Sequence, residues 1–226
     1  MGTPIDWSSL NDTTKLLMNQ LHYGALGFMV LAYTVKIWQL LKKPAAKEGT
    51  TARGNHAEGI RYAYMTLAMP WEIESQKNNM FRYLEFVVFH IAMAVGIGWA
   101  FVTPIANTSM AAPAVKYPAM VIFGLGALIG LSRLLRRLLK AEMRKISSPD
   151  DYFCLLLLTV WMASGVLAAP LHNATYLTAY FALATFFLVY VPFSKISHYV
   201  YWPFVRFYMG KHFGHRGVFP KKGTIQ

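Results

Sequence analysis

Two histidines in apolar segments are the residues of this chain best suited to chemistry. His90 lies within the apolar segment 86–94, and His198 follows Pro192 at the end of another apolar segment. Neutral imidazoles bind ferric and ferrous iron well, and two of them fill both axial positions of an iron porphyrin. An unpaired imidazole in lipid is costly. We therefore expect His90 and His198 to hold one haem iron between two helices, rather than to be two structural histidines.

The elements that must position these histidines are apolar and long. The chain has 226 residues, of which 55% are hydrophobic and 14% charged, a composition that does not fit an ordinary soluble domain. Each apolar stretch is close to the ~20 residues that a helix needs to cross a bilayer. Five stretches are found, at residues 20–41, 82–104, 116–138, 152–170 and 174–194. The sequence thus predicts an all-α integral membrane bundle of five transmembrane helices.

The distribution of basic residues predicts the orientation of this bundle. The formal net charge is +12, and the Lys and Arg residues concentrate in the segments 42–77, 133–145 and 195–222. On the opposite face we find only Lys15 and Lys116. The positive-inside rule therefore places the N-terminus outside and the C-terminus in the cytoplasm. The same distribution favours a basic membrane protein over a nucleic-acid binder.

The domain organisation follows from these spans. We expect an outer N-terminal segment at 1–19, a five-helix transmembrane domain at 20–200 that includes a cytoplasmic loop at 42–81, and a basic cytoplasmic tail at 201–226. The apolar patch 62–71 in the loop predicts either a docking surface or an amphipathic helix resting on the membrane. In the tail, Pro203 is expected to interrupt the helix, and the H-x-x-H spacing of His212 and His215 is a weak metal-binding signal.

Several residues predict local structure. Gly126 and Gly130 have the small-xxx-small spacing of a close helix contact, and Asn173 with Thr175 is expected to open the fifth helix. Arg82 and Glu85 are three residues apart and are expected to pair at the membrane interface. The sequence has one cysteine, Cys154, which excludes an internal disulfide and a covalent C-x-x-C-H haem attachment. Any haem is therefore held non-covalently.

The residues Pro192-Phe193-Ser194-Lys195-x-x-His198 resemble the end of the fifth helix in the respiratory nitrate reductase gamma subunit family, and Phe89-His90-Ile91 resembles its second-helix motif. The superfamily includes the membrane cytochrome b subunits of heterodisulfide-reductase-like and sulfite-reductase-associated complexes. The resemblance covers the topology and these two helices. It implies a multi-pass protein of the prokaryotic inner (plasma) membrane.

In that family four histidines hold two b haems, and the resemblance assigns His90 and His198 to the haem nearer the cytoplasmic partner. The positions expected for the outer pair are Ala100 and Tyr180, so this pair is missing. The resemblance therefore implies one haem b. Tyr180 is expected to be a polar lining or interface residue rather than an iron ligand.

The remaining site predictions concern the haem propionates and the quinone. The cytoplasmic-side cations Arg82 and Lys195 are expected to pair with the propionates, with snorkelling to the interface as the alternative. Quinone is expected to bind near His90 and His198, or in the vacated region toward Tyr180, His22 and His172. For His22, an interfacial histidine facing water is the structural alternative.

Together these features predict an electron relay between the membrane quinone pool and a cytoplasmic iron-sulfur or catalytic subunit. The chain offers no substrate-reducing centre and no catalytic residue of its own, so enzymatic activity would belong to the complex. A haem-free integral membrane anchor or assembly subunit is the rival prediction. A small transporter ranks third, because intramembrane charge is sparse and no internal repeat is evident.

Overall fold

The computed structural model describes residues 7, 10–44 and 48–220, and every regular element within these ranges is helical. Five helical segments are long and apolar enough to cross a membrane, which confirms the predicted fold class. They are Asp12–Lys42, Met80–Val102, Pro113–Leu139, Pro149–Ala168 and Ala174–Phe193. The chain is thus a multi-pass helical membrane protein by the length and hydropathy of its helices.

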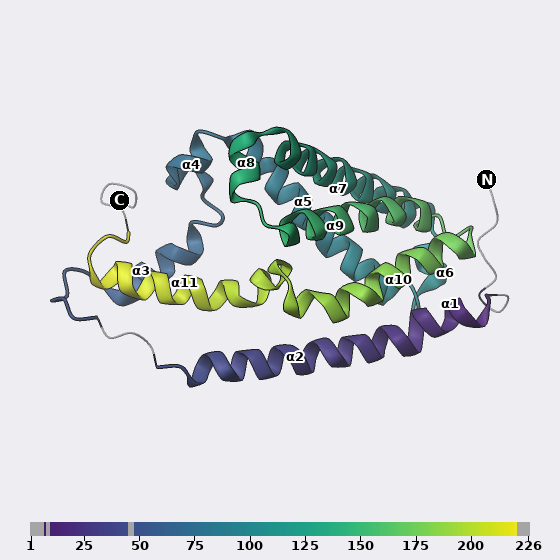
Figure 1. Cartoon of the computed structure of the whole chain (residues 1–226), viewed down its shortest axis with the longest axis horizontal. Helices are drawn as coiled ribbons and strands as arrows, with labels where there is room; N and C mark the ends of the chain where they lie inside the picture. The colour runs from purple at the N-terminus through teal and green to yellow at the C-terminus, as the bar shows by residue number, and fades with distance from the viewer. Residues whose placement is uncertain (1–6, 8–9, 45–47, 221–226) are drawn as a thin grey trace. The chain divides into compact units, whose positions relative to one another are not determined.

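The first span begins earlier than the sequence predicts. It is built from α1 (Asp12–Leu16), a π-helical segment (Leu17–Leu21) and α2 (His22–Lys42), which run on from one another (Figure 1). Asn11 caps this helix, because its side-chain oxygen accepts from the backbone N–H of Thr14 at 2.8 Å. The polar residues before position 20 therefore form the first turns of the helix.

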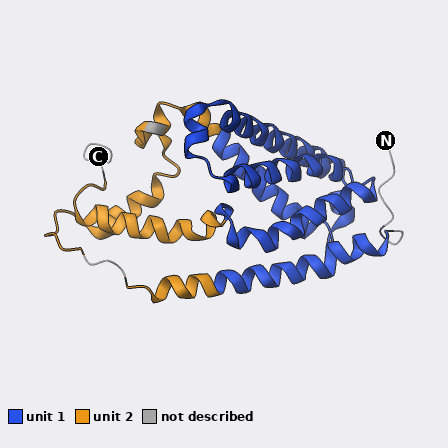
Figure 2. Ribbon diagram, viewed as in Figure 1, with its two compact units in different colours: residues 1–34, 85–196 blue, residues 35–84, 197–226 orange. Residues whose placement is uncertain are grey.

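The chain divides into two compact units (Figure 2). Unit 1 contains residues 1–34 and 85–196, and unit 2 contains residues 35–84 and 197–226. Unit 1 thus holds most of the membrane-spanning helices, and unit 2 combines the predicted loop and tail with two helix ends.

Unit 1 is built around α9 (Pro149–Ala168), which packs against α7 (Pro113–Leu139) and α10 (Ala174–Tyr190). A Cβ atom on Gly126 would lie 2.8 Å from the Cβ of Ala92 in α5 (Met80–Val102) and 3.1 Å from the sulfur of Met162. A Cβ atom on Gly130 would collide with the hydroxyl of Thr159. The close helix contact predicted for these two glycines is therefore confirmed.

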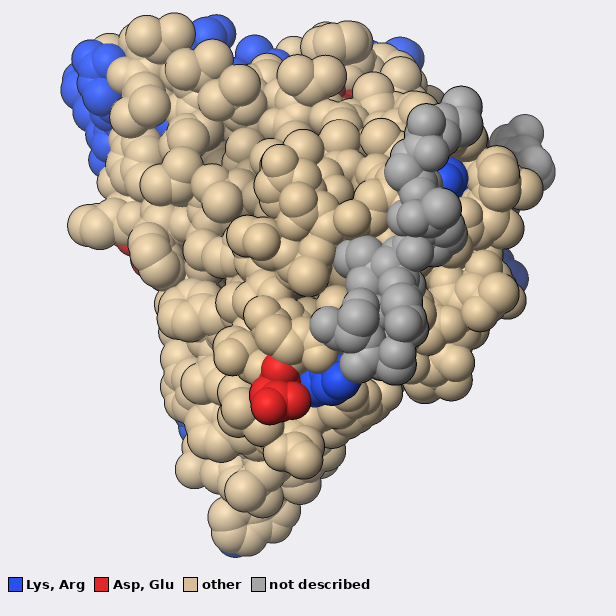
Figure 3. Space-filling model, turned by 90° about the vertical axis from the view of Figure 1, so that its right-hand side faces the viewer, with Lys and Arg blue, Asp and Glu red and all other residues tan. Residues whose placement is uncertain are grey.

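The outer surface of unit 1 is apolar. On α7, Val121 is 62% exposed and Leu128 is 65% exposed, although both are large aliphatic residues. Figure 3 views the molecule from the right-hand side of Figure 1, and charged side chains are few on the face that it shows. Such a surface is expected where helices face lipid chains rather than water.

The short elements of unit 1 join these spans and cap them. They are α6 (Asn107–Met110), α8 (Ala141–Ile146), and the 3₁₀ turns η4 (Val191–Phe193) and η5 (Lys195–Ser197). Asn173 opens α10 as predicted, since its side-chain oxygen accepts from the backbone N–H groups of Thr175 at 2.8 Å and Tyr176 at 3.3 Å. Ser148 and Asp151 form a reciprocal capping box at the start of α9.

Unit 2 is organised by the contact between α3 (His56–Met65) and α11 (His198–His215). Three buried glycines let the two backbones meet: a Cβ atom on Gly59 would collide with backbone atoms of Gly210 and Gly214. The remaining regular elements in this unit are η3 (Pro70–Glu72) and α4 (Glu74–Lys77), together with the ends of α2 and α5. The predicted loop and tail therefore form one helical structure.

The expectation that Pro203 interrupts the last helix is wrong. Helix α11 runs from His198 to His215 with Pro203 inside it. Proline removes one backbone hydrogen bond from a helix, and here the packing of α11 on α3 offsets that loss. The carbonyl of Pro203 also accepts a hydrogen bond from the hydroxyl of Tyr64 on α3, at 2.6 Å.

The apolar patch 62–71 is divided between the interior and the surface of unit 2. Tyr62 is 3% exposed and Ala63 is fully buried, whereas Leu67 and Trp71 are exposed. Tyr62 and Ala63 belong to α3 and contribute to the packing of the unit. A docking or membrane-resting role therefore stays a prediction for the exposed residues only.

Candidate functional site

His90 lies on α5, one helical turn after Phe86. Its side chain is exposed, and its Nδ1 atom lies 2.7 Å from the backbone oxygen of Phe86. A carbonyl oxygen can only accept, so Nδ1 carries the proton and donates it. In a neutral imidazole the lone pair is then on Nε2. This is the tautomer that metal-ligating histidines adopt when the second nitrogen bonds to a backbone carbonyl.

Aromatic and charged side chains surround the same part of α5. The ring of Phe86 lies 4.1 Å from the ring of His90, centroid to centroid, and the guanidinium of Arg133 lies 4.9 Å from the ring centroid of Phe89. Glu85 forms an ion pair with Arg136 of α7 at 3.4 Å. The predicted pairing of Glu85 with Arg82 is therefore replaced by a contact between α5 and α7.

His198 is the first residue of α11, and its side chain is exposed. Helix α10 ends at Tyr190, and the turns η4 and η5 separate it from His198. His198 thus follows the fifth span rather than ending it, because the chain turns at Pro192 before a new helix starts. His90 belongs to unit 1 and His198 to unit 2.

Lys195 is held by acidic and hydroxyl groups of α9 and its cap. Its Nζ atom lies 2.6 Å from the carboxylate of Asp151 and 2.7 Å from the hydroxyl of Ser148, and its backbone N–H donates to Asp150 at 3.2 Å. Lys195 would have to exchange the Asp151 carboxylate for a propionate to act as predicted. Arg82 is exposed near the start of α5 and belongs to unit 2.

Tyr180 and Ala100 lie in the interior of unit 1, where they are fully buried and 2% exposed, respectively. The Tyr180 hydroxyl donates to the backbone oxygen of Gly96 at 2.6 Å and so joins α10 to α5. Its ring stacks on that of Trp161, with centroids 5.6 Å apart and planes 17° apart. The interface role expected for Tyr180 is consistent with this geometry.

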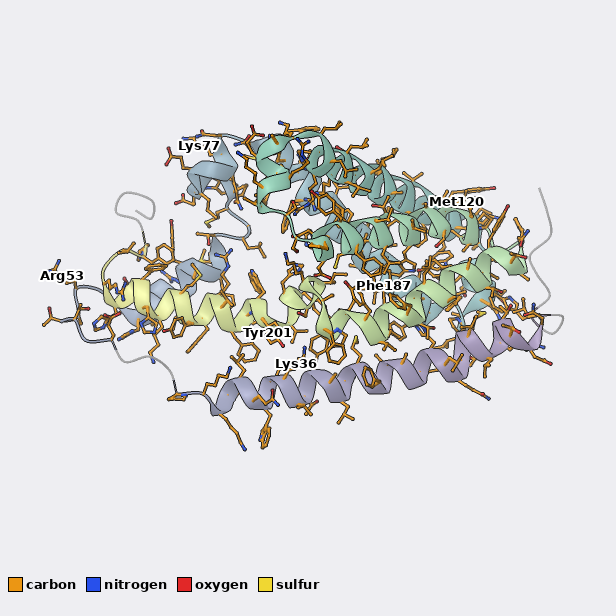
Figure 4. All side chains as sticks on the ribbon, viewed as in Figure 1. Lys36, Arg53, Lys77, Met120, Phe187 and Tyr201 are labelled. Atoms are coloured by element: carbon orange, nitrogen blue, oxygen red, sulfur yellow. The ribbon has the colours of Figure 1, made fainter. Side chains whose placement is uncertain are left out.

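Other aromatic rings complete the interior around Tyr180. The ring centroids of Phe123 and Phe181 lie 6.0 Å and 5.6 Å from that of Tyr180. Phe187, labelled in Figure 4, is on the same helix as Tyr180, and its ring centroid lies 5.3 Å from that of Trp161 on α9. The interior around Ala100 and Tyr180 is therefore an aromatic core.

His22 is 1% exposed and does not face water. Its ring packs 4.8 Å from Phe101 and 5.7 Å from Phe181, and its Nδ1 atom lies 3.2 Å from the hydroxyl of Thr185. The interfacial alternative for His22 is therefore wrong, because the first span begins a full ten residues before it. His172 lies between α9 and α10 and is partly exposed.

No group of three or more His, Cys, Asp or Glu side chains in the described parts of the chain could hold a metal ion. The comparisons with known proteins found no matching family model, no similar curated protein and no similar solved structure. The fold thus defines a five-span helical membrane protein. The family resemblance rests on the residues around His90 and on those from Pro192 to His198.

One histidine contact was not predicted from the sequence. His56 begins α3, and its Nε2 atom lies 3.4 Å from the Nδ1 atom of His215 at the end of α11. His212 instead contacts Glu48 at 3.3 Å, so the H-x-x-H pair points to two different partners. Because His56 and His215 are 159 positions apart, no local spacing could have indicated the contact.

Proposed function

We propose that the chain is a membrane cytochrome b subunit that relays electrons between the quinone pool and a cytoplasmic iron-sulfur or catalytic partner. One b haem would be held by His90 and His198 in a prokaryotic plasma membrane. The observation that carries the proposal is the hydrogen bond of the His90 side chain. His90 is an imidazole on a membrane-spanning helix, and its Nδ1 atom donates to the Phe86 carbonyl, as the second nitrogen of metal-ligating histidines commonly does.

The donor chemistry of these residues fits haem iron. Two neutral imidazoles saturate the axial positions, and haem bound in this way supplies one-electron transfer without binding oxygen. His90 would be fixed in orientation by its own helix, whereas His198 would follow the turns η4 and η5. Arg82 and Lys195 are the proposed propionate partners. Lys195 would give up its ion pair with Asp151, a partly exposed contact that contributes little to stability.

We propose one haem rather than two because the second pair of ligands is missing. Ala100 has no donor atom in its side chain, and the Tyr180 hydroxyl already donates to Gly96. Iron ligation by Tyr180 would require a phenolate and would leave the Gly96 carbonyl without its donor. Both changes are costly inside an aromatic core.

The packing also favours one of the two proposed quinone regions. A quinone headgroup could reach Tyr180 or His22 only if the rings of Phe101, Phe123 or Phe181 moved, since both side chains are almost completely buried. We therefore propose that quinone binds nearer His90 and His198. His172, which is partly exposed between α9 and α10, belongs to the other proposed region.

The proposed partner would bind on the side that carries the basic segments. The segments 42–77, 133–145 and 195–222 are predicted to be cytoplasmic, and their charge would attract an acidic surface or anionic lipid. The exposed apolar residues Leu67 and Trp71 lie in the first of these segments. They are suited to the apolar part of such an interface.

A quinol-reduction experiment tests the proposed function. Anaerobic addition of a quinol to the purified chain is expected to produce a reduced b-type spectrum, because electrons pass from the quinol to the haem. Tyr180→Phe and His22→Gln are expected to reduce at the wild-type rate, since neither residue would touch the quinone. A haem that only dithionite reduces would contradict a quinone-linked relay. Slow reduction confined to these two variants would move the quinone to the Tyr180 region.

A further inference from the structure

The contact between His56 and His215 joins the start of α3 to the end of α11 within unit 2. The imidazole centroids are 5.1 Å apart, and the facing nitrogens, Nε2 of His56 and Nδ1 of His215, are 3.4 Å apart. This pair is separate from the proposed haem ligands. Its chemistry depends on which of its nitrogens carry protons.

Backbone carbonyls settle the tautomers of both rings. The Nδ1 atom of His56 lies 3.1 Å from the oxygen of Lys211, and the Nε2 atom of His215 lies 2.8 Å from the oxygen of Thr50. Carbonyl oxygens only accept, so these two nitrogens are the protonated ones. In the neutral rings, the two facing nitrogens therefore both carry lone pairs. Two lone pairs at this separation repel unless a cation lies between them.

The geometry is that of two ligands on one metal ion. Two nitrogens that each lie about 2.0–2.1 Å from a tetrahedral ion are about 3.3–3.4 Å apart, which matches the separation here. Metal-ligating histidines commonly donate their other N–H to a backbone carbonyl, and both rings do so. A shared proton is the competing occupant, and it would form a long N–H···N hydrogen bond.

The loop beside the pair is held in place by the same helix end. The backbone N–H groups of Arg53 and Gly54 donate to the oxygen of His215 at 2.8 Å and 3.1 Å. These bonds keep the Thr50 carbonyl within reach of the His215 ring. Nearby, Glu48 is committed to Arg216 and His212, and its hydrogen bond from Arg216 lowers the pKa of its carboxyl to about 2. Glu48 is thus an ionised partner of other residues.

We propose that His56 and His215 form a binding site for one divalent transition-metal ion, with Zn²⁺ as the representative metal. Imidazole nitrogens select Zn²⁺, Cu²⁺ or Ni²⁺ over Mg²⁺ and Ca²⁺, which require oxygen ligands. Water or a group from a partner would fill the remaining positions. The bound ion would clamp α3 to α11, independently of the proposed electron relay.

Equilibrium dialysis of the full-length chain in detergent against micromolar Zn²⁺, followed by elemental analysis, tests the site. The wild-type chain is expected to retain about one equivalent of Zn²⁺ above the buffer. His56→Gln and His215→Gln should each weaken retention about tenfold or more, because one ligand is lost. His212→Gln is the matched control, since it lies on the same helix and contacts Glu48 instead; it should retain the wild-type affinity.

Three results would overturn the metal site. Zinc retention that is equal in the wild type and both ligand variants would place the ion elsewhere on the chain. If His212→Gln weakened zinc retention to the same extent, the loss would not be specific to His56 and His215. No retention by the folded wild type would contradict the metal site and leave a shared proton as the occupant. Circular dichroism of each variant shows whether the helices remain folded.

Discussion

Replacing His90 or His198 with alanine is expected to abolish the bis-histidine spectrum of the b haem. Each variant would leave the iron with one axial imidazole, so the low-spin six-coordinate state could not form. Loss of an outer-shell partner alone typically costs about 10–100-fold in metal affinity, and loss of a ligand should cost at least as much. Absorption spectra of the purified variants, with haem content normalised to protein, measure the effect.

His172→Ala is the control for these substitutions because His172 lies in a turn outside the proposed site. Its spectrum should match that of the wild type. A bis-histidine spectrum that persists in His90→Ala or His198→Ala would remove that residue from the ligand set. Global misfolding would also abolish the haem spectrum. Loss of helical circular dichroism would distinguish misfolding from the loss of a ligand.

Substitution of Gly59 by alanine is expected to separate α3 from α11. Alanine normally favours a helix by about 1 kcal/mol over glycine, but overpacking typically costs about 1–3 kcal/mol and occasionally more. Here the added Cβ would meet backbone atoms of Gly210 and Gly214, which cannot rotate away as a side chain can. The packing cost should therefore exceed the helix gain. Hydrogen exchange of the α3 amides reports the resulting loss of protection.

Gly98→Ala and Gly49→Ala are matched controls for this substitution, because nothing lies within 4 Å of the Cβ atom that either would add. Gly98 is in a helix and Gly49 is in the same unit as Gly59. Neither control should reduce the protection of α3. Unchanged protection in Gly59→Ala would show that the glycine contact does not hold α3 on α11.

The spans were predictable from the sequence because hydropathy over about 20 residues decides whether a helix can cross a membrane. The helix contact at Gly126 and the cap at Asn173 were also predictable, since each depends on a short local pattern. The start of the first span was not. Asp12 and Asn19 are polar and lower the local hydropathy, yet they continue the helix that Asn11 caps.

Contacts between distant segments could not be predicted in this way. Glu85 was expected to pair with Arg82 on its own helix, but Arg136 reaches it from α7. The bond from Tyr180 to Gly96 joins residues 84 positions apart, and the contact of His56 with His215 crosses 159 positions. Such pairs depend on how helices pack, for which periodicity within one segment gives no information.

Residue type is enough to identify the candidate ligands in the sequence, but it does not predict which side chains surround them in the fold. His90 is recognisable in the sequence as an ionisable residue in an apolar helix, and the structure adds the hydrogen bond that assigns its tautomer. The contacts of Lys195 with Asp151 and Ser148 could not be predicted either. They form because the capping box of α9 lies beside the η5 turn, a proximity that the sequence does not reveal.

The haem stoichiometry of the purified chain tests the central proposal most directly. A pyridine haemochrome assay, normalised to protein by amino-acid analysis, should give one b haem per chain. That value follows from two histidine ligands at His90 and His198 and from the aromatic core around Ala100 and Tyr180. Two haems per chain would contradict the single site. The absence of b haem from a folded chain would contradict the electron relay and favour a haem-free membrane anchor.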